Sequence, residues 1–176
     1  MAEKAAPLAP QPAALDRVRR RMLNPFLLRG FFLAKLPLAL FAGLNVHELN
    51  AERCVTSVPY GWRSTNPFHS TYFAALSMAA ELSTGGLALL ATELAAEPVA
   101  LIIVDLQASF GKKATARTTF TCEEGPKVFA AVASTIESGE PATATLETVG
   151  RMPDGAEIAR FTFTWSFKRR SRSARG

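Results

Sequence analysis

The sequence predicts an α+β domain in which a curved antiparallel sheet wraps one long, buried helix. Residues 69–82, HSTYFAALSMAAEL, form the strongest helical run and are apolar almost all round, so this helix must be surrounded by protein. Residues 157–167 alternate between apolar and polar side chains, the pattern of a sheet with one buried face. The apolar side chains of that segment are Ala159, Phe161, Phe163, Trp165 and Phe167.

The N-terminal part predicts a tail followed by two helices. Residues 1–13 are rich in proline and alanine, a composition typical of a terminal tail. Residues 15–23 suit a short basic helix that ends at Asn24. A second helix follows over residues 25–36, with a proline at its first position, and Pro37 stops it.

The remaining segments predict six strands and two helices. Two strands precede the buried helix, at residues 41–49 and 53–59, and a loop at 60–68 follows them. The two glycines at 85 and 86 either end the helix or bend its continuation through residue 94. The later elements are strands at 99–110 and 114–122 around a turn at 111–113, a short helix at 125–138, and strands at 142–149 and 157–167. Because strands and helices do not alternate one by one, this order disfavours a parallel Rossmann-like sheet.

Length and charge indicate one domain with short extensions. The chain has 176 residues, and 48% of them are hydrophobic, enough for a real core. We expect an N-terminal extension at residues 1–37, the domain at 38–168 and a basic tail at 169–176. Much of the net charge of +5 lies near the C-terminus, where residues 168–176 hold cations and no acid. We expect no nucleic-acid partner, although contact of the tail with RNA, acidic lipid or CoA phosphates stays open.

The apolar run at residues 26–46 is not expected to span a membrane. Arg29, Lys35 and Pro37 interrupt it, so no continuous apolar stretch of about 20 residues remains. The N-terminus lacks the pattern of a signal peptide. Residues 26–36 can pack against the domain, cover a pocket or touch a membrane surface, and the sequence leaves these alternatives open.

The two cysteines predict buried thiols. Cys54 and Cys122 lie far apart in strand-like segments, without the paired Cys or His ligands of a metal site. We therefore expect no metal, two reduced thiols and a cytoplasmic location.

Glu81 is the main candidate for chemistry. It lies among alanines and leucine in the apolar helix, where a carboxylate needs a partner or acquires a raised pKa. Ala74 and Ser77 fall on the same helix face. The alternative is that Glu81 is solvated or pairs with Arg63.

Two residues before the helix have both a structural and a functional interpretation. Asn66 precedes a proline and suits a turn, but its side chain can also orient water or a carbonyl group. His69 can cap or pack at the helix start, or act as a general base near neutral pH.

The stretch at residues 66–81, NPFHSTYFAALSMAAE, resembles the helix motif of the hotdog-fold thioesterases of the phenylacetate-pathway type. That motif has an Asn, a His-Gly-Gly turn and an acid 15 positions after the Asn, which Asn66 and Glu81 match. The His-Gly-Gly turn falls instead on Tyr72, Phe73 and Ala74. A small-residue version that ends in Glu occurs in a related hotdog group defined as a domain of unknown function, and this chain is closer to that group.

The resemblance covers roughly residues 38–168 and implies an acyl-CoA thioesterase. Its substrate would be an acyl-CoA-type small molecule, with no cofactor apart from the substrate's own coenzyme A. It also implies a homodimer or dimer of dimers, with each site formed at the interface from the Asn of one chain and the acid of the other. Residues 104–115 resemble the family's hairpin between the third and fourth strands.

The resemblance also implies roles for individual residues. Glu81 would act as general base or nucleophile, and Asn66 would position water or substrate. Backbone N–H groups around Phe73 and Ala74 would hold the oxyanion. The other expected substrate contacts are His69, Tyr72, Ser77, Lys112 and Lys113, of which the two lysines either meet CoA phosphates or are ordinary surface residues.

Four functional hypotheses remain open from the sequence. The first is a thioesterase, and the second is a non-catalytic module that binds acyl-CoA or acyl chains, favoured by the missing His-Gly-Gly turn. A hotdog hydratase or dehydratase would need His69 beside the acid. An RNA-binding protein is suggested only by the basic tail.

Overall fold

The computed structural model describes residues 12–170. Residues 1–11 of the expected N-terminal tail and residues 171–176 of the basic tail lie outside the described part. The elements in chain order are α1 Pro12–Leu23, α2 Pro25–Lys35, α3 Pro37–Ala42, β1 Asn45–Leu49, β2 Cys54–Val58, α4 Phe73–Glu93, β3 Val99–Phe110, β4 Thr118–Cys122, α5 Gly125–Ser138, β5 Ala142–Arg151 and β6 Glu157–Arg169.

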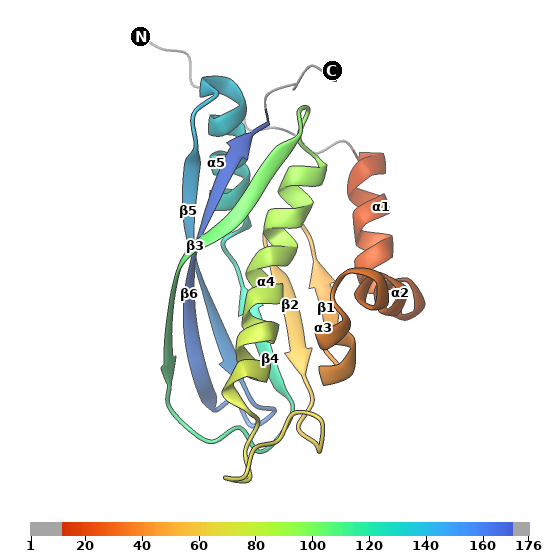
Figure 1. Ribbon diagram of the computed structural model, residues 1–176, viewed down its shortest axis with the longest axis vertical. Coiled ribbons are helices and arrows are strands. Elements are labelled where there is room, and N and C mark those ends of the chain that lie inside the picture. The colour runs from red at the N-terminus through yellow and green to blue at the C-terminus, as the bar shows by residue number, and fades with distance from the viewer. Residues whose placement is uncertain (1–11, 171–176) are drawn as a thin grey trace.

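The six strands form one antiparallel sheet in the order β1-β2-β4-β5-β6-β3, which curves around α4 (Figure 1). This arrangement confirms the predicted fold class. Helices α1, α2 and α3 lie beside β1 and α4 (Figure 1). The sequence predicted α1 and α2 but not α3.

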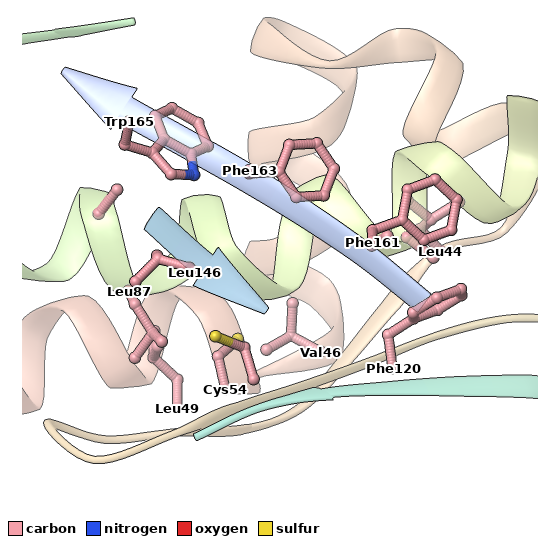
Figure 2. Packing of buried hydrophobic residues seen from close by; sticks show 14 of the residues in the cluster. Leu44, Val46, Leu49, Cys54, Leu87, Phe120, Leu146, Phe161, Phe163 and Trp165 are labelled. Carbon is pink, nitrogen blue, oxygen red and sulfur yellow. The ribbon is translucent and has the colours of Figure 1, made fainter. Parts of the chain in front are cut away.

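The core lies between α4 and the concave face of the sheet (Figure 2). The apolar face predicted for β6 is buried, and Phe161 and Phe163 stack with ring centroids 6.0 Å apart. Buried polar groups pair across this interface: the indole Nε1–H of Trp165 donates to Thr84 Oγ1 at 3.1 Å, and the hydroxyls of Ser83 and Thr148 lie 2.8 Å apart. Burial of the apolar side chains stabilises the domain, and the paired polar groups avoid the penalty of desolvation.

Helix α4 is longer than predicted. It continues through Gly85 and Gly86 to Glu93, so these glycines do not end it. An added Cβ would lie 3.3 Å from the Trp165 ring at Gly85 and 2.9 Å from Cys54 Sγ at Gly86. The glycines therefore let the helix approach the sheet closely. By length and composition α4 could cross a membrane, but the sheet encloses it as the core helix of the domain.

The segment before the first strand differs from the prediction of a strand at 41–49. Pro37 does not only stop α2, because it also begins α3, where a proline at the first position needs no N–H partner. Gly43 ends α3 in the left-handed conformation with φ 76°. The strand β1 begins only at Asn45.

The predicted hairpin at residues 104–115 is wrong. Strand β3 pairs with β6 at the edge of the sheet, whereas β4 pairs with β2 and β5 in its middle. Residues 111–117 therefore cross from the edge of the sheet to its centre. This crossing brings the two lysines of the connection close to the start of α4.

The N-terminal helices are part of the folded domain. Asn24 caps α2, with its Oδ1 accepting from the N–H groups of Phe26 at 3.0 Å and Leu27 at 3.2 Å. The side chains that α1 and α2 bury in the core are Val18, Met22, Leu28 and Phe32. At the other end, β6 continues to Arg169, two residues beyond the predicted strand and one residue into the expected tail.

The two cysteines are buried free thiols, as predicted. They face each other across the β2–β4 pair, in register. Burial raises the pKa of both thiols, and that of Cys122 reaches about 11. Thiols with such pKa values carry little thiolate at neutral pH, which makes Cys54 and Cys122 packing residues.

Candidate functional site

The loop before α4 is held by a turn centred on Asn66. The side-chain Oδ1 of Asn66 accepts from Phe68 N at 3.0 Å, Ser70 N at 3.3 Å and Ser70 Oγ at 3.2 Å. This confirms the turn interpretation of Asn66. Among residues 12–170 its amide nitrogen has no hydrogen-bond acceptor, so the NH₂ group is the part of Asn66 that can donate to a ligand.

Helix α4 begins at Phe73, four residues later than predicted. Thr71 N–H donates to Ala114 O at 2.7 Å and Tyr72 N–H donates to Ser64 O at 2.6 Å, so these residues are tied to neighbouring loops instead of the helix. Neither Ser70 nor Thr71 caps α4, and the N-cap residue Tyr72 makes no side-chain cap bond.

The first two N–H groups of α4 are available as donors. The first bonds to a preceding carbonyl come from Ala75 and Leu76, both to Tyr72 O. Within the described residues the N–H groups of Phe73 and Ala74 have no acceptor. The positive end of the helix dipole adds to their attraction for a negative oxygen.

A pocket of about 460 Å³ lies at this end of α4. It brings together four of the predicted site residues, which are Asn66, Phe73, Lys112 and Lys113. The Phe73 ring is exposed and meets Phe110 at a centroid distance of 6.0 Å. The Lys113 ammonium donates to Phe68 O at 3.1 Å, which fixes one cation beside the Asn66 turn.

The other predicted contacts do not line this pocket. His69 is exposed in the left-handed backbone conformation, with φ 57°. Tyr72 is exposed and packs on the Phe73 ring. Ser77 donates its hydroxyl hydrogen to Phe73 O at 2.9 Å, and Ala74 is half-buried.

Glu81 lines a second pocket, of about 500 Å³, on the side of α4 that faces the N-terminal helices. The Glu81 side chain is exposed, which agrees in part with the alternative of a solvated carboxylate, yet it also lines a largely apolar pocket, and this partial desolvation raises its pKa. Glu81 has no ion-pair partner within residues 12–170. The alternative of a pair with Arg63 is wrong, because that guanidinium group lies near Gly43.

The two pockets are separate in one chain and share no lining residue. Phe73 and Glu81 lie eight positions apart on α4, roughly 12 Å along its axis. A single carbonyl group therefore cannot meet both the free N–H groups and the carboxylate of one chain. Each chain carries two half-sites, one with donors and one with a carboxylate.

The sequence did not identify most of the second pocket. Its further lining residues include Lys35, Leu38, Met78, Leu101 and Trp165, which come from five different elements. The one signal was the apolar run at 26–36, for which covering a pocket was an open alternative. Phe31, Lys35 and Leu36 now bear out that alternative in part, because they form part of the lining. Within residues 12–170 no three metal-ligating side chains come together.

Comparisons with known proteins find the fold but no close relative. No protein-family model matches the chain. No curated protein matches it either. Solved structures do: a Chlorobaculum tepidum protein of unknown function superposes with a TM-score of 0.70 at 15% identity, over 85% of this chain and 99% of the other.

Two further similar structures carry thioesterase descriptions. A Pseudomonas aeruginosa protein of unknown function, described as a "probable thioesterase", has a TM-score of 0.67 at 19% identity, over 85% of this chain and 99% of the other. A Haemophilus influenzae thioesterase has a TM-score of 0.58 at 12% identity, over 78% of this chain and 86% of the other. The chain has the hotdog fold of these proteins, as the resemblance of its helix motif implied.

Proposed function

We propose that this protein hydrolyses acyl thioesters such as acyl-CoA, with Glu81 as the catalytic carboxylate. The observation that carries the proposal is a carboxyl group with a raised pKa and no ion-pair partner among residues 12–170, placed in a largely apolar pocket. A general base works best when its pKa approaches the working pH. The thioesterase descriptions of structural neighbours point to the same reaction class.

In the proposed reaction, the Glu81 carboxylate removes a proton from water as the water oxygen attacks the thioester carbonyl carbon. The tetrahedral oxyanion accepts hydrogen bonds from the N–H groups of Phe73 and Ala74. Collapse of the intermediate breaks the C–S bond, and the thiolate takes the proton back from Glu81. The products are a carboxylic acid and a thiol. Direct attack by Glu81 would instead give an anhydride that water hydrolyses.

The complete site is proposed to form between two copies of the chain. One copy would supply Glu81 and the other the Asn66 turn with the free N–H groups, which fits their separation along α4. The outer edge of β3 is the proposed contact, because it pairs with β6 on one side only. Its side chains Ile102 and Val104 are 65% and 57% exposed, and an open apolar edge favours pairing with a second strand.

The lysines of the first pocket are proposed to receive the carrier end of the substrate. Lys112 and Lys113 line that pocket beside the Asn66 turn, where their charges suit the phosphates of coenzyme A.

A non-catalytic acyl-binding module is the second candidate. The exposed Phe73 ring favours it, since it stands at the helix start where the family motif has glycine. The hydratase alternative gains no support, because His69 lines neither pocket.

The first test compares acyl-CoA hydrolysis by the wild type, Glu81→Gln and Glu137→Gln. Glu137 is exposed on α5 and lines neither pocket, so its variant removes the same charge without touching the site. We expect Glu81→Gln to lose about 10² to 10⁴-fold in kcat/KM and the control to keep full activity. Because desolvation raises the Glu81 pKa, the acidic limb of the wild-type profile should lie above an ordinary carboxyl value. Hydrolysis by Glu81→Gln at the wild-type rate would refute the assignment.

Mixing two inactive variants tests the shared site. Asn66→Asp keeps the acceptors that hold the turn but removes the NH₂ donor. A dimer of one Glu81→Gln chain and one Asn66→Asp chain contains one site with both original residues. An equal mixture, unfolded and refolded together, should recover about a quarter of wild-type activity. Activity no higher than that of the separate variants would show that the two residues do not meet across an interface.

A further inference from the structure

We propose that the pocket at Glu81, with one wall from α2 and α3, is the acyl-chain site of this protein, and that its substrates carry unsubstituted aliphatic chains of medium or greater length. This inference rests on the function proposed above, whose site needs a place for the acyl group beside Glu81. The pocket at Glu81 has a volume of about 500 Å³, within the usual range for a small-molecule site.

The wall opposite α4 comes from the junction between α2 and α3. Leu36 and Leu38 stand on either side of Pro37 at this junction, and all three line the pocket. Leu36 is 43% exposed and Leu38 is 70% exposed, so neither is consumed by packing in the core. An aliphatic chain that enters the pocket would remove their surface from water, which is the main source of affinity for such a ligand.

The floor of the pocket also presents apolar groups. Leu101 of β3 and Trp165 of β6 line it, together with Gly85 of α4. The Trp165 Nε1–H is already bonded to Thr84 Oγ1 at 3.1 Å, so the indole offers its ring and no spare donor. The missing side chain at Gly85 lets α4 pack directly on this ring, because an added Cβ would lie 3.3 Å from it.

The lining defines what the acyl group can carry. Apart from Glu81 and Lys35, no side chain of the pocket has a hydroxyl, amide or charged group. A hydroxyl or amide on the acyl chain would lose its water there and find no partner along the wall. The pocket therefore favours plain alkyl chains over hydroxylated or amino-substituted acyl groups.

Binding of S-alkyl-CoA thioethers, from ethyl to dodecyl, tests this inference by isothermal titration calorimetry on the full chain. Thioethers cannot be hydrolysed, so the measurement stands even if the proposed catalysis fails. We expect Kd to fall by up to about fourfold for each added methylene until the pocket is full. A 3-hydroxyalkyl thioether should bind at least about tenfold more weakly than its alkyl counterpart.

Two matched variants test whether the alkyl chain binds in this pocket. Leu38 and Leu33 are 70% and 68% exposed, but only Leu38 lines the pocket. Leu38→Asn should raise the Kd of the dodecyl thioether by about fivefold or more and leave the Kd of the ethyl thioether unchanged. Leu33→Asn should change neither Kd. An affinity of the wild type that does not depend on chain length would overturn the proposal, and so would equal weakening by the two variants.

Discussion

The start of α5 is wedged against the turn between β1 and β2, and this contact can be tested by one methyl group. Gly125 is buried, and its N–H donates to Glu52 O at 2.9 Å. A Cβ added at Gly125 would lie 2.0 Å from Ala51 O. Contacts of this kind need more than about 3 Å, so the helix start and the turn must separate by about 1 Å. Gly125→Ala therefore overpacks this interface and lengthens its hydrogen bond.

The expected loss of stability in Gly125→Ala combines three effects. Overpacking contributes about 1–3 kcal/mol and the weakened hydrogen bond about 1 kcal/mol. The alanine restricts the unfolded chain, which offsets about 0.5–1 kcal/mol. We expect Gly125→Ala to lower the free energy of unfolding by about 1–3.5 kcal/mol, measured by equilibrium urea denaturation.

Gly30→Ala is the matched control. Gly30 lies in the middle of α2, and apart from its own helix backbone and chain neighbours no atom stands within 4 Å of the added Cβ. Alanine should stabilise this helix by about 0.5–1 kcal/mol, the opposite sign to Gly125→Ala. A Gly125→Ala protein within about 0.5 kcal/mol of the wild type would refute the reasoning.

Three further predictions concern buried or partly buried polar groups. The buried hydroxyls of Ser83 and Thr148 lie 2.8 Å apart, so Ser83→Ala should lower the free energy of unfolding by about 1–3 kcal/mol. Adding Thr148→Val to this variant should restore part of the lost stability, whereas additive losses would contradict the pairing. Cys54 and Cys122 should resist a thiol reagent in the native protein at about pH 8 and react only on unfolding, whereas rapid native labelling would contradict their burial. Because the pKa of Glu81 is raised in the folded state, the charged carboxylate destabilises the fold at pH values above that pKa, and it has no effect below the ordinary carboxyl pKa. Glu81→Gln should therefore raise Tm near neutral pH and leave Tm unchanged in acid. A lower Tm of the variant at neutral pH would show that the carboxylate is stabilising.

Local patterns predicted the bounds or the buried face of several elements. The strand Val99–Phe110 and the helix Gly125–Ser138 have the expected bounds. The face of β6 that alternates from Ala159 to Phe167 is buried as predicted. Helix α5 and strand β6 each bury one face, so their period alone reveals their structure. Strand β3 shows no alternation of burial, and its long apolar run predicted it instead.

The errors arise where distant contacts override local signals. The helix predicted from His69 starts at Phe73 because Thr71 is bonded to Ala114, a partner 43 positions away. A glycine at position 85 predicts a break or bend of the helix, yet α4 continues there, and the missing side chain leaves room for the Trp165 ring. Strand β3 pairs with β6, which follows much later in the chain, and not with β4 after the next turn, so no local signal could predict its partner.

The sequence predicted a few residues that line the two pockets, but not the geometry of either pocket. Asn66 and Glu81 each line a pocket, but the sequence alone could not place them in different pockets. Leu38 and Trp165 could not be connected to Glu81 either, because only the tertiary fold brings α3, β6 and α4 together.

The position of Trp165 gives the protein an optical reporter of its own. The chain has two tryptophans, of which Trp62 is 80% exposed and Trp165 is 6% exposed at the floor of the Glu81 pocket. A Trp62→Phe protein would retain a single emitter, largely shielded from iodide. Displacement of water from the indole by an arriving ligand should shift its emission, which would allow occupancy to be followed in real time without a label.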